Sequence, residues 1–357
     1  MLIVPYYSVI GGWVIKYLVE YFRGNAKLLA EDGYFTDFIS NGVSTELCFV
    51  AFCAFTLIII FAGVQNGIER VSKIMMPILI VLSVIIAVYS VTRPGALAGV
   101  KYFLVPNVKN FSWMTVVSAM GQMFYSLSIA MGILITFGSY MKKDTAIEDS
   151  TRNVEVFDTG IAIMAGLMII PAVFAFSGGD PDTLQAGPSL MFITIPKVFQ
   201  NMGFGTVIGI VFFLLVLFAA VTSSIALTES AVSTFEDELG WGRKKATVLV
   251  GVIMLVLGSL SSLGYGPLAG IKIIGMQFLD LFDFLTNSVM MPIAALLTSL
   301  LVSRVVGIDK IEEEIIHGES AFRRKKVFVV MIKYLCPVFA IIILLSSVAN
   351  ALGWIKM

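Results

Sequence analysis

The sequence has few charged residues and almost no histidine or cysteine. Only 13% of its 357 residues are charged, and it contains one histidine and three cysteines. Cys48, Cys53 and Cys336 lie in or beside apolar stretches without the spacing of a metal site, so we interpret them as small hydrophobic residues. His317 lies in a charged connector, where a solvated surface histidine is expected rather than a proton relay.

Sequence motifs of enzymes are also lacking. The chain contains no Gly-X-Ser-X-Gly, no His-Glu-X-X-His and no phosphate-binding loop. Asp158 and Asp283 lie in apolar stretches, as in an intramembrane aspartyl protease, but the Tyr-Asp and Gly-X-Gly-Asp contexts of such a protease do not occur. These absences argue against an enzyme, and a net charge of zero gives no reason to expect a nucleic acid as partner.

Apolar sequence is abundant. Apolar residues make up 58% of the chain and the mean hydropathy is +0.94, far above the values of a soluble domain. We therefore predict an all-α polytopic membrane protein with about nine transmembrane helices, each about 20 residues long. The predicted spans cover about residues 1–22, 43–63, 72–91, 113–141, 151–177, 203–235, 246–263, 275–303 and 328–353.

The connectors between these spans differ in positive charge. Taken alternately, one set holds 14 Lys and Arg residues, whereas the other set and the C-terminal tail hold eight. The positive-inside rule places the richer set in the cytoplasm, with the N-terminus inside and the C-terminus outside. The richer set comprises residues 64–74, 142–152, 236–245 and 304–327.

Residues 124–132 place hydroxyl and small side chains in the middle of a stretch long enough to cross the bilayer. In hydrocarbon, unwound backbone persists only where its N–H and C=O groups face protein or a cavity. Secondary transporters use such interrupted helices to surround a substrate and its coupling ion. This segment is the strongest indication of function from the residues alone.

Five segments of the chain resemble the neurotransmitter:sodium symporter family, in its bacterial branch of sodium-dependent amino-acid transporters. They are residues 6–13, 121–128, 219–226, 235–239 and 279–284. The resemblance implies sodium-coupled symport of an amino acid by alternating access, in a multi-pass protein of the inner (plasma) membrane. It also implies a fold of two inverted five-helix repeats.

Matched onto that family, the nine spans are its third to eleventh helices. The resemblance thus implies an incomplete 5+5 inverted-repeat fold, N-terminally truncated before the third helix. In this single transmembrane domain, 1–357, residues 1–91 would be the remainder of the first repeat, 113–303 the second repeat, and 328–353 an extra C-terminal helix. An absent N-terminal two-helix segment would then be a partner. The alternative function is a non-transporting membrane remnant or accessory subunit of the same fold.

Candidate sodium ligands lie at two places. The spacing of Ala219, Thr222 and Ser223 puts a carbonyl and two hydroxyls near one helical face, which suits a hard cation. Alternatively, the hydroxyls bond back to their own helix or join a neighbouring helix. The resemblance assigns these positions to the second Na⁺ site and Ser126 to the first, with Asp158 as its expected partner. Alternatively, Asp158 is a structural residue bonded to backbone.

The resemblance also implies a substrate pocket. Tyr7 matches the tyrosine that donates to the substrate carboxylate. Because methionine is adaptable, the pocket suits an apolar or aromatic amino acid. Without the resemblance these side chains would be ordinary core packing. The positions that line the pocket are Ile3, Tyr125, Ser128, Met131, Ser223 and Leu227.

Four further positions match gates of the family. Asp283 corresponds to an outer-gate carboxylate, Tyr140 and Asp237 to inner-gate positions, and Glu229 to a polar position of the inner pathway. Asp237 could equally be a solvated charge in the acidic run 236–238. The expected partners are an amino acid, Na⁺ as coupling ion and the lipid bilayer, and no cofactor is expected.

Overall fold

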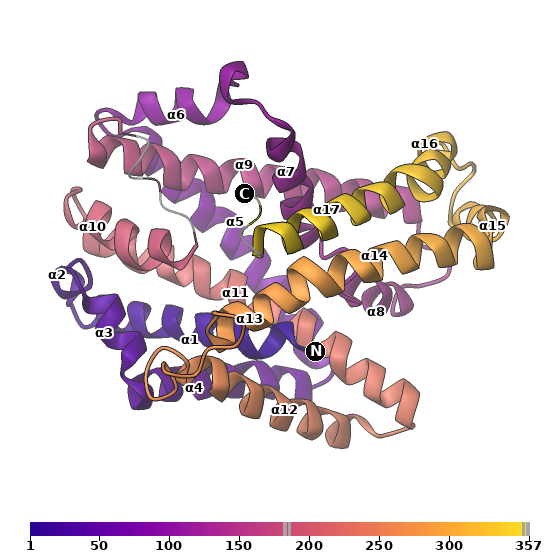
Figure 1. Ribbon diagram of the computed structural model, residues 1–357, viewed down its shortest axis with the longest axis horizontal. Helices are drawn as coiled ribbons and strands as arrows, with labels where there is room; N and C mark the ends of the chain where they lie inside the picture. The colour runs from indigo at the N-terminus through magenta and orange to yellow at the C-terminus, as the bar shows by residue number, and fades with distance from the viewer. Residues whose placement is uncertain (181–183, 185–186, 352–353, 355–357) are drawn as a thin grey trace. The chain divides into compact units, whose positions relative to one another are not determined.

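The computed structural model describes residues 1–180, 184, 187–351 and 354. This part of the chain is helical apart from its turns and one isolated β-bridge between Ile273 and Met276. The chain forms two compact units, unit 1 with residues 1–106 and 161–281, and unit 2 with residues 107–160 and 282–357. Helices α9 and α13 contribute to both units (Figure 1).

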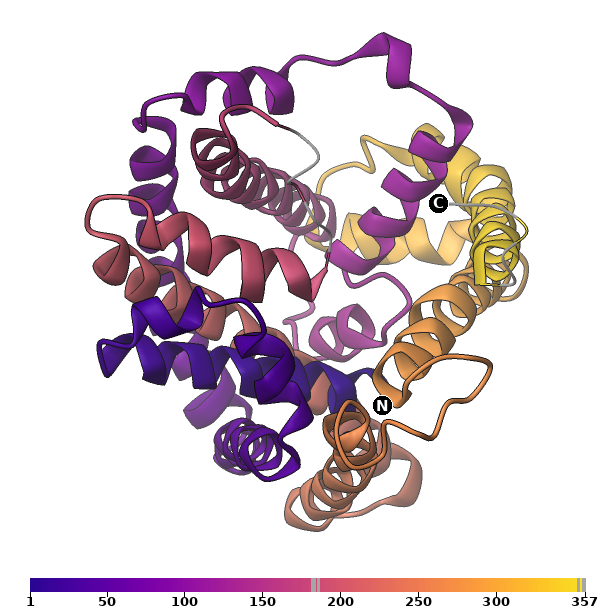
Figure 2. The ribbon, with the colours of Figure 1, turned by 60° about the vertical axis from the view of Figure 1, so that its left-hand side comes forward.

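Unit 1 is built around long helices that lie side by side. Helix α1 packs against α4, α11 and α12, and α11 also packs against α5 (Figures 1 and 2). The elements of unit 1 are α1 (Ile3–Phe22), α2 (Ala26–Leu29), α3 (Tyr34–Ser40), α4 (Gly42–Phe61), η1 (Val64–Glu69), α5 (Arg70–Val91), α6 (Ala96–Leu104), the second half of α9 (Ile147–Ser177), η4 (Leu190–Thr194), α10 (Ile195–Gln200), α11 (Gly205–Leu239), α12 (Arg243–Leu263) and most of α13 (Phe278–Asp283).

Small residues bring the helices of unit 1 close together. A Cβ atom on Gly12 of α1 would lie 2.7 Å from the backbone nitrogen of Phe49 in α4, and one on Gly11 would lie 2.5 Å from the Phe52 ring. The hydroxyls of Thr56 in α4 and Ser224 in α11 are 3.1 Å apart and share a hydrogen bond. Close approach and hydrogen bonding of this kind hold helices together in lipid, where burial of apolar surface gives little driving force.

An aromatic cluster fills the core of unit 1. Tyr17 stacks on Phe213 with ring centroids 5.3 Å apart, and Phe192 stacks on Phe35 at 5.2 Å. The buried Tyr17 hydroxyl donates a 2.8 Å hydrogen bond to the Phe192 carbonyl, so its polar end is satisfied. The cluster fixes α1 against α11 and against the segment that leads into α10.

Unit 2 contains the helices that flank the interrupted segment. Ser112 and Thr115 form a capping box at the start of α7, which satisfies two backbone N–H groups there. Helices α14 and α17 run along each other (Figure 1). The elements of unit 2 are η2 (Val108–Asn110), α7 (Trp113–Ser126), α8 (Ile133–Ser139), the first half of α9, η5 (Phe284–Met290), α14 (Met291–Leu300), η6 (Leu301–Val306), α15 (Ile308–Gly318), α16 (Lys325–Val330), η7 (Met331–Leu335) and α17 (Cys336–Ala351).

Seven helical stretches in the described residues are long and apolar enough to cross a membrane. Each coincides with a predicted span, which confirms an all-α membrane fold, whereas the count of nine stays a prediction. Span 1–22 is helix α1, whose Lys16 and Glu20 lower its hydropathy. Span 113–141 is interrupted, and the last two residues of span 328–353 lie outside the described residues. The seven stretches are Gly42–Phe61, Val64–Val91, Ile147–Ser177, Gly205–Leu239, Arg243–Leu263, Phe278–Val306 and Lys325–Ala351.

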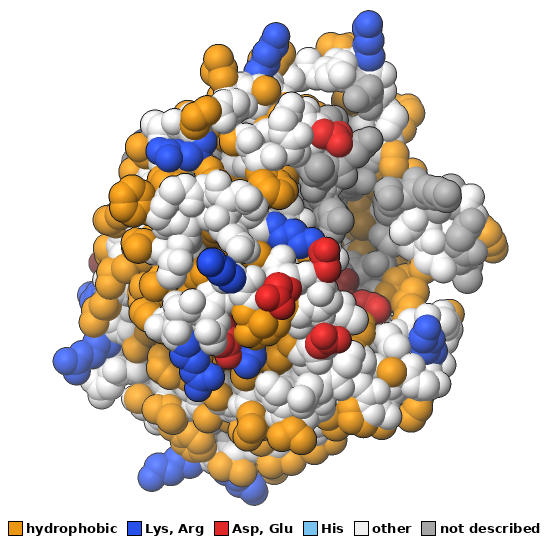
Figure 3. All heavy atoms as spheres, turned by 90° about the vertical axis from the view of Figure 1, so that its left-hand side faces the viewer, with side chains coloured by type: hydrophobic (Ala, Val, Ile, Leu, Met, Phe, Trp, Pro, Cys, Tyr) orange, Lys and Arg blue, Asp and Glu red, His pale blue; other side chains and the backbone are white. Residues whose placement is uncertain are grey.

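Large apolar side chains are exposed along these helices. Val43 and Leu47 of α4 are 74% and 67% exposed, and Leu345 of α17 is 64% exposed. Figure 3 shows one face of the molecule, on which apolar side chains are widespread and acidic and basic side chains intermingle over the centre. Exposed apolar surface on this scale fits contact with lipid rather than water.

Candidate functional site

The predicted interruption is present in unit 2. Helix α7 ends at Ser126 and α8 begins at Ile133, so the six residues between them are not helical. Ser128 and Ala130 have φ angles of +54° and +63°, a left-handed conformation that costs an L residue on the order of 1–2 kcal/mol. Backbone strain of this kind is concentrated at functional sites, because the surrounding structure must maintain it.

Ser126 and Asp158 meet beside this interruption. The Ser126 hydroxyl donates a 2.6 Å hydrogen bond to Oδ1 of Asp158, which is half-buried on α9. The structure therefore gives Asp158 a side-chain partner, in contrast to the alternative of a bond to backbone. A carboxylate and a hydroxyl oxygen side by side are the ligand types that a hard cation prefers.

The second set of candidate sodium ligands lies on α11 in unit 1. The Thr222 hydroxyl donates to the carbonyls of Phe218 at 3.0 Å and Ala219 at 3.1 Å, as in the back-bonding alternative. This arrangement also brings the Thr222 hydroxyl and the Ala219 carbonyl together. Donation uses the hydroxyl proton and leaves the oxygen lone pairs available, so both atoms can still accept a cation. Ser223 follows with an exposed side chain.

The substrate candidates of unit 1 come from α1 and α11. Tyr7 of α1 is half-buried, and Ser223 of α11 is exposed. Ile3 and Leu227 are buried, at 6% and 7% exposure. The candidates of unit 2 are all half-buried and lie at the interrupted segment or directly before it. They are Tyr125, Ser128 and Met131.

The predicted gate residues differ in their surroundings. Asp283 is exposed and accepts a 2.6 Å hydrogen bond from the side-chain amide of Asn287, one turn further along. Tyr140 packs edge-on against Phe137 with ring centroids 6.1 Å apart. Asp237 is exposed near the end of α11, which agrees with the alternative of a solvated charge.

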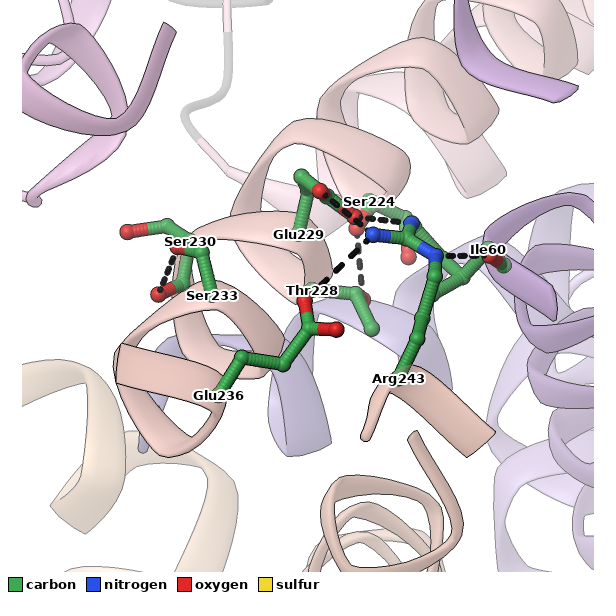
Figure 4. Close-up of polar contacts among 8 residues, drawn as sticks. All are labelled: Ile60, Ser224, Thr228, Glu229, Ser230, Ser233, Glu236 and Arg243. Atoms are coloured by element: carbon green, nitrogen blue, oxygen red, sulfur yellow. Dashed lines mark hydrogen bonds and ion pairs between the residues drawn. The ribbon is translucent and has the colours of Figure 1, made fainter. Parts of the chain in front are cut away.

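Glu229 has a partner that sequence reasoning missed. Its side chain is fully buried, and Arg243 donates to its two carboxylate oxygens at 3.0 and 2.6 Å (Figure 4). The same guanidinium donates to the Ile60 carbonyl at 3.0 Å and lies 3.6 Å from the Glu236 carboxylate. A buried carboxylate is tolerated when it is paired and hydrogen-bonded, and Arg243 supplies both interactions. Arg243, the first residue of α12, thereby contacts the end of α4 and the last third of α11.

Known proteins similar to the chain are sodium-dependent transporters. Residues 35–354 match the family described as "Sodium:neurotransmitter symporter family". The chain is 34% identical over 351 residues to a protein of Bacillus subtilis (strain 168) named "Uncharacterized sodium-dependent transporter YhdH", covering 97% of this chain and 77% of that protein. A Haemophilus influenzae protein named "Uncharacterized sodium-dependent transporter" is 30% identical over 356 residues, with 97% of this chain and 76% of that protein covered. The relative from Methanocaldococcus jannaschii, MJ1319, is 28% identical over 332 residues, with 88% and 65% covered.

The fold is also similar to a solved structure. MhsT in complex with L-phenylalanine aligns with a TM-score of 0.83 and 34% sequence identity, covering 97% of this chain and 78% of that chain. The chain spans about three quarters of the length of MhsT and of the Bacillus subtilis relative, and an absent N-terminal two-helix segment stays a prediction.

Proposed function

Because the chain belongs to the sodium:neurotransmitter symporter family, we propose that it carries an amino acid together with Na⁺ across the plasma membrane by alternating access. Membership makes the chain a sodium-coupled, multi-pass membrane transporter and not an enzyme, as the sequence predicts. Na⁺ as the coupling ion fits the family as well. The amino-acid substrate, the pocket and the ion ligands are the parts that we propose.

The observation that carries this proposal is the interrupted helix with its hydrogen-bonded carboxylate. Six unwound residues follow α7, and the last residue of α7 holds Asp158 at 2.6 Å. A half-buried carboxylate in a spanning helix is costly unless it has a task, and a monovalent cation would compensate its charge. Binding of Na⁺ there would stabilise the conformation that accepts substrate, which couples the two binding events.

The proposed substrate is an apolar or aromatic amino acid. Its carboxylate would accept a hydrogen bond from the hydroxyl of Tyr7, a half-buried residue of α1. Within unit 2, the half-buried Tyr125 and Met131 are candidate pocket residues whose apolar surface suits an apolar or aromatic side chain. The related MhsT structure holds L-phenylalanine, which is consistent with a pocket of this character.

The test is uptake into proteoliposomes that contain the purified chain. Radiolabelled phenylalanine, leucine, glutamate and lysine are supplied with an inward Na⁺ gradient, and then with choline in place of Na⁺. We expect uptake of phenylalanine or leucine that choline abolishes, and little uptake of the charged amino acids. Protein-free liposomes are the control. A folded chain that neither takes up nor binds any amino acid in Na⁺ would contradict the proposal and favour a non-transporting remnant or accessory subunit.

A further inference from the structure

Helix α9 is capped by a residue from a distant connector. Oε1 of Glu319, just after α15, accepts hydrogen bonds from the backbone nitrogens of Glu148 at 2.6 Å and Asp149 at 3.3 Å, in the first turn of α9. The first N–H groups of a helix have no partner within the helix, and the helix dipole favours a negative charge beside them. The Glu319 carboxylate, from a distant segment of unit 2, thus accepts hydrogen bonds from these N–H groups and places a negative charge beside them.

A side chain of α9 in turn binds the backbone of the connector that follows α15. Oε2 of Glu148 accepts a 2.9 Å hydrogen bond from the backbone nitrogen of Arg323, ahead of α16 (Figure 1). Arg324 donates to Oε2 of Glu155 at 2.9 Å and lies 3.9 Å from Glu148. The hydrogen bond to Glu155 raises the pKa of Arg324 above its ordinary value, which keeps the guanidinium charged. We call these five residues, Glu148, Glu155, Glu319, Arg323 and Arg324, the connector latch.

The backbone around Gly318 also lies close to the backbone around Thr145, next to the connector latch. A Cβ atom on Gly318 would lie 2.6 Å from the Thr145 carbonyl oxygen, so the turn after α15 lies directly against the turn before α9. Any larger residue at Gly318 would push the two turns apart. The close approach and the hydrogen bonds therefore fix the same place, the start of α9.

The first half of α9 has little other support among the described residues. Residues 151–157 are all exposed, including Val156 at 61% and Phe157 at 62%. The next residue is Asp158, whose hydrogen bond to Ser126 is the other tie of this half-helix. Within unit 2, polar contacts at Glu148, Asp149, Glu155 and Asp158 therefore hold this half of α9.

We propose that Glu319, with Arg324, positions Asp158 for Na⁺ binding. The inference rests on the proposed function, since it takes Asp158 as a ligand of the coupling ion. The distance from Glu148 to Asp158 along the helix is about 15 Å, and a continuous helix of that length transmits a change at its first turn. Glu319 touches neither the ion nor the substrate, so it is a positioning residue that acts through α9.

The first arm of the test compares sodium dependence in matched variants. Glu319→Gln keeps the shape of the side chain and removes its charge, and Glu313→Gln makes the same change at an exposed position of α15. We expect Glu319→Gln to raise the Na⁺ concentration for half-maximal uptake by about tenfold, as for other residues that orient a metal ligand, while the maximal rate changes by less than about twofold. Glu319→Asp, which restores the carboxylate, should recover most of the sodium affinity, and Glu313→Gln should behave as the unaltered protein.

The second arm measures amide hydrogen exchange of residues 147–158 in the purified chain, with and without Na⁺. We expect exchange of this segment to rise in Glu319→Gln without Na⁺, and to require a higher Na⁺ concentration for protection. If Na⁺ protects the segment equally in Glu319→Gln and Glu313→Gln, or if only thermal stability and the maximal rate fall, the positioning role is overturned. If Na⁺ has no effect on the unaltered protein in either arm, the proposed function itself fails, which is a different result.

Discussion

The Ser126 hydroxyl donates a 2.6 Å hydrogen bond to the Asp158 carboxylate, which joins the last residue of α7 to the middle of α9. The bond lies beside the unwound residues that follow α7, where the backbone of Ser128 and Ala130 is left-handed. A carboxylate, a hydroxyl and non-helical backbone thus occur at one place in unit 2. This arrangement is the structural basis for assigning a coupling-ion site to the chain.

We predict that Asp158→Asn impairs sodium coupling. The amide keeps the shape of the side chain and its bond to Ser126 but removes the charge that balances Na⁺. Interactions with a charged group are worth about 1.5–3 kcal/mol, so the half-maximal Na⁺ concentration should rise about 10- to 100-fold. Ser126→Ala should have a smaller effect in the same direction. Uptake measured across a Na⁺ titration checks this, with Asp144→Asn on an exposed turn as the control. Sodium dependence in Asp158→Asn equal to that of the control would remove Asp158 from the ion site.

A second prediction concerns the Tyr7 hydroxyl, which we propose as the donor to the substrate carboxylate. Tyr7→Phe removes that donor and keeps the aromatic ring. We expect the KM for the amino acid to rise about tenfold or more, because a hydrogen bond to a charged group is lost. Tyr102→Phe, on the exposed face of α6, removes a hydroxyl elsewhere and should leave the KM unchanged. An unchanged KM in Tyr7→Phe would mean that the substrate carboxylate binds elsewhere.

The ion pair between the buried Glu229 and the half-buried Arg243 leads to a stability prediction. Glu229→Gln removes the charge that pairs with Arg243, whose side chain is 22% exposed and keeps the Ile60 carbonyl and Glu236 as neighbours. We therefore expect a cost below the about 3–5 kcal/mol of breaking a fully buried pair. The thermal unfolding temperature in detergent should fall strongly, whereas Glu238→Gln, at an exposed position of the same helix, should leave it nearly unchanged. The double variant Glu229→Gln with Arg243→Gln should unfold at a higher temperature than Glu229→Gln alone. If Glu229→Gln and Glu238→Gln unfold at the same temperature, the pair of Glu229 and Arg243 does not stabilise the fold.

Some of this arrangement could be predicted from the sequence, since its signal is local. Hydroxyl and small side chains within an apolar run predict an interruption at residues 124–132, and the structure has it at 127–132, since α7 continues to Ser126. The long spans follow from run length and composition. The contact of Ser126 with Asp158 also agrees with prediction, but there the resemblance to a family supplied the pairing. Neither residue alone indicates its partner.

The polar networks at the helix ends could not be predicted. Arg243 lies in a basic connector whose charge predicts the membrane orientation of the chain. In the structure its side chain donates to the buried Glu229 and to the Ile60 carbonyl. Glu319 accepts hydrogen bonds from the backbone nitrogens of Glu148 and Asp149, although Asp149 lies 170 residues before it in the sequence. Such bonds depend on which helix ends meet in space, and charge patterns in connectors resemble those of solvated loops.

A fourth prediction separates two glycines that the sequence does not distinguish. Gly12→Ala would place a methyl group 2.7 Å from the Phe49 backbone, so α1 and α4 must move apart, at a cost of about 1–3 kcal/mol. Gly121 on α7 has no atom within 4 Å of an added Cβ, and Gly121→Ala should stabilise that helix by about 0.5–1 kcal/mol. Thermal unfolding of the two variants checks both signs. A Gly12→Ala variant as stable as the unaltered protein would show that the packing of α1 on α4 is looser than the structure indicates.

The most direct test of sodium-coupled amino-acid transport by this chain is a flux of ²²Na⁺ driven by the amino acid. Proteoliposomes containing the chain are given an inward phenylalanine or leucine gradient with equal Na⁺ on both sides, and ²²Na⁺ entry is followed together with entry of the amino acid. We predict that the amino-acid gradient drives ²²Na⁺ inward at a fixed ratio to the amino acid, and that Asp158→Asn abolishes this coupling. Amino-acid entry that proceeds without any ²²Na⁺ entry would contradict the account.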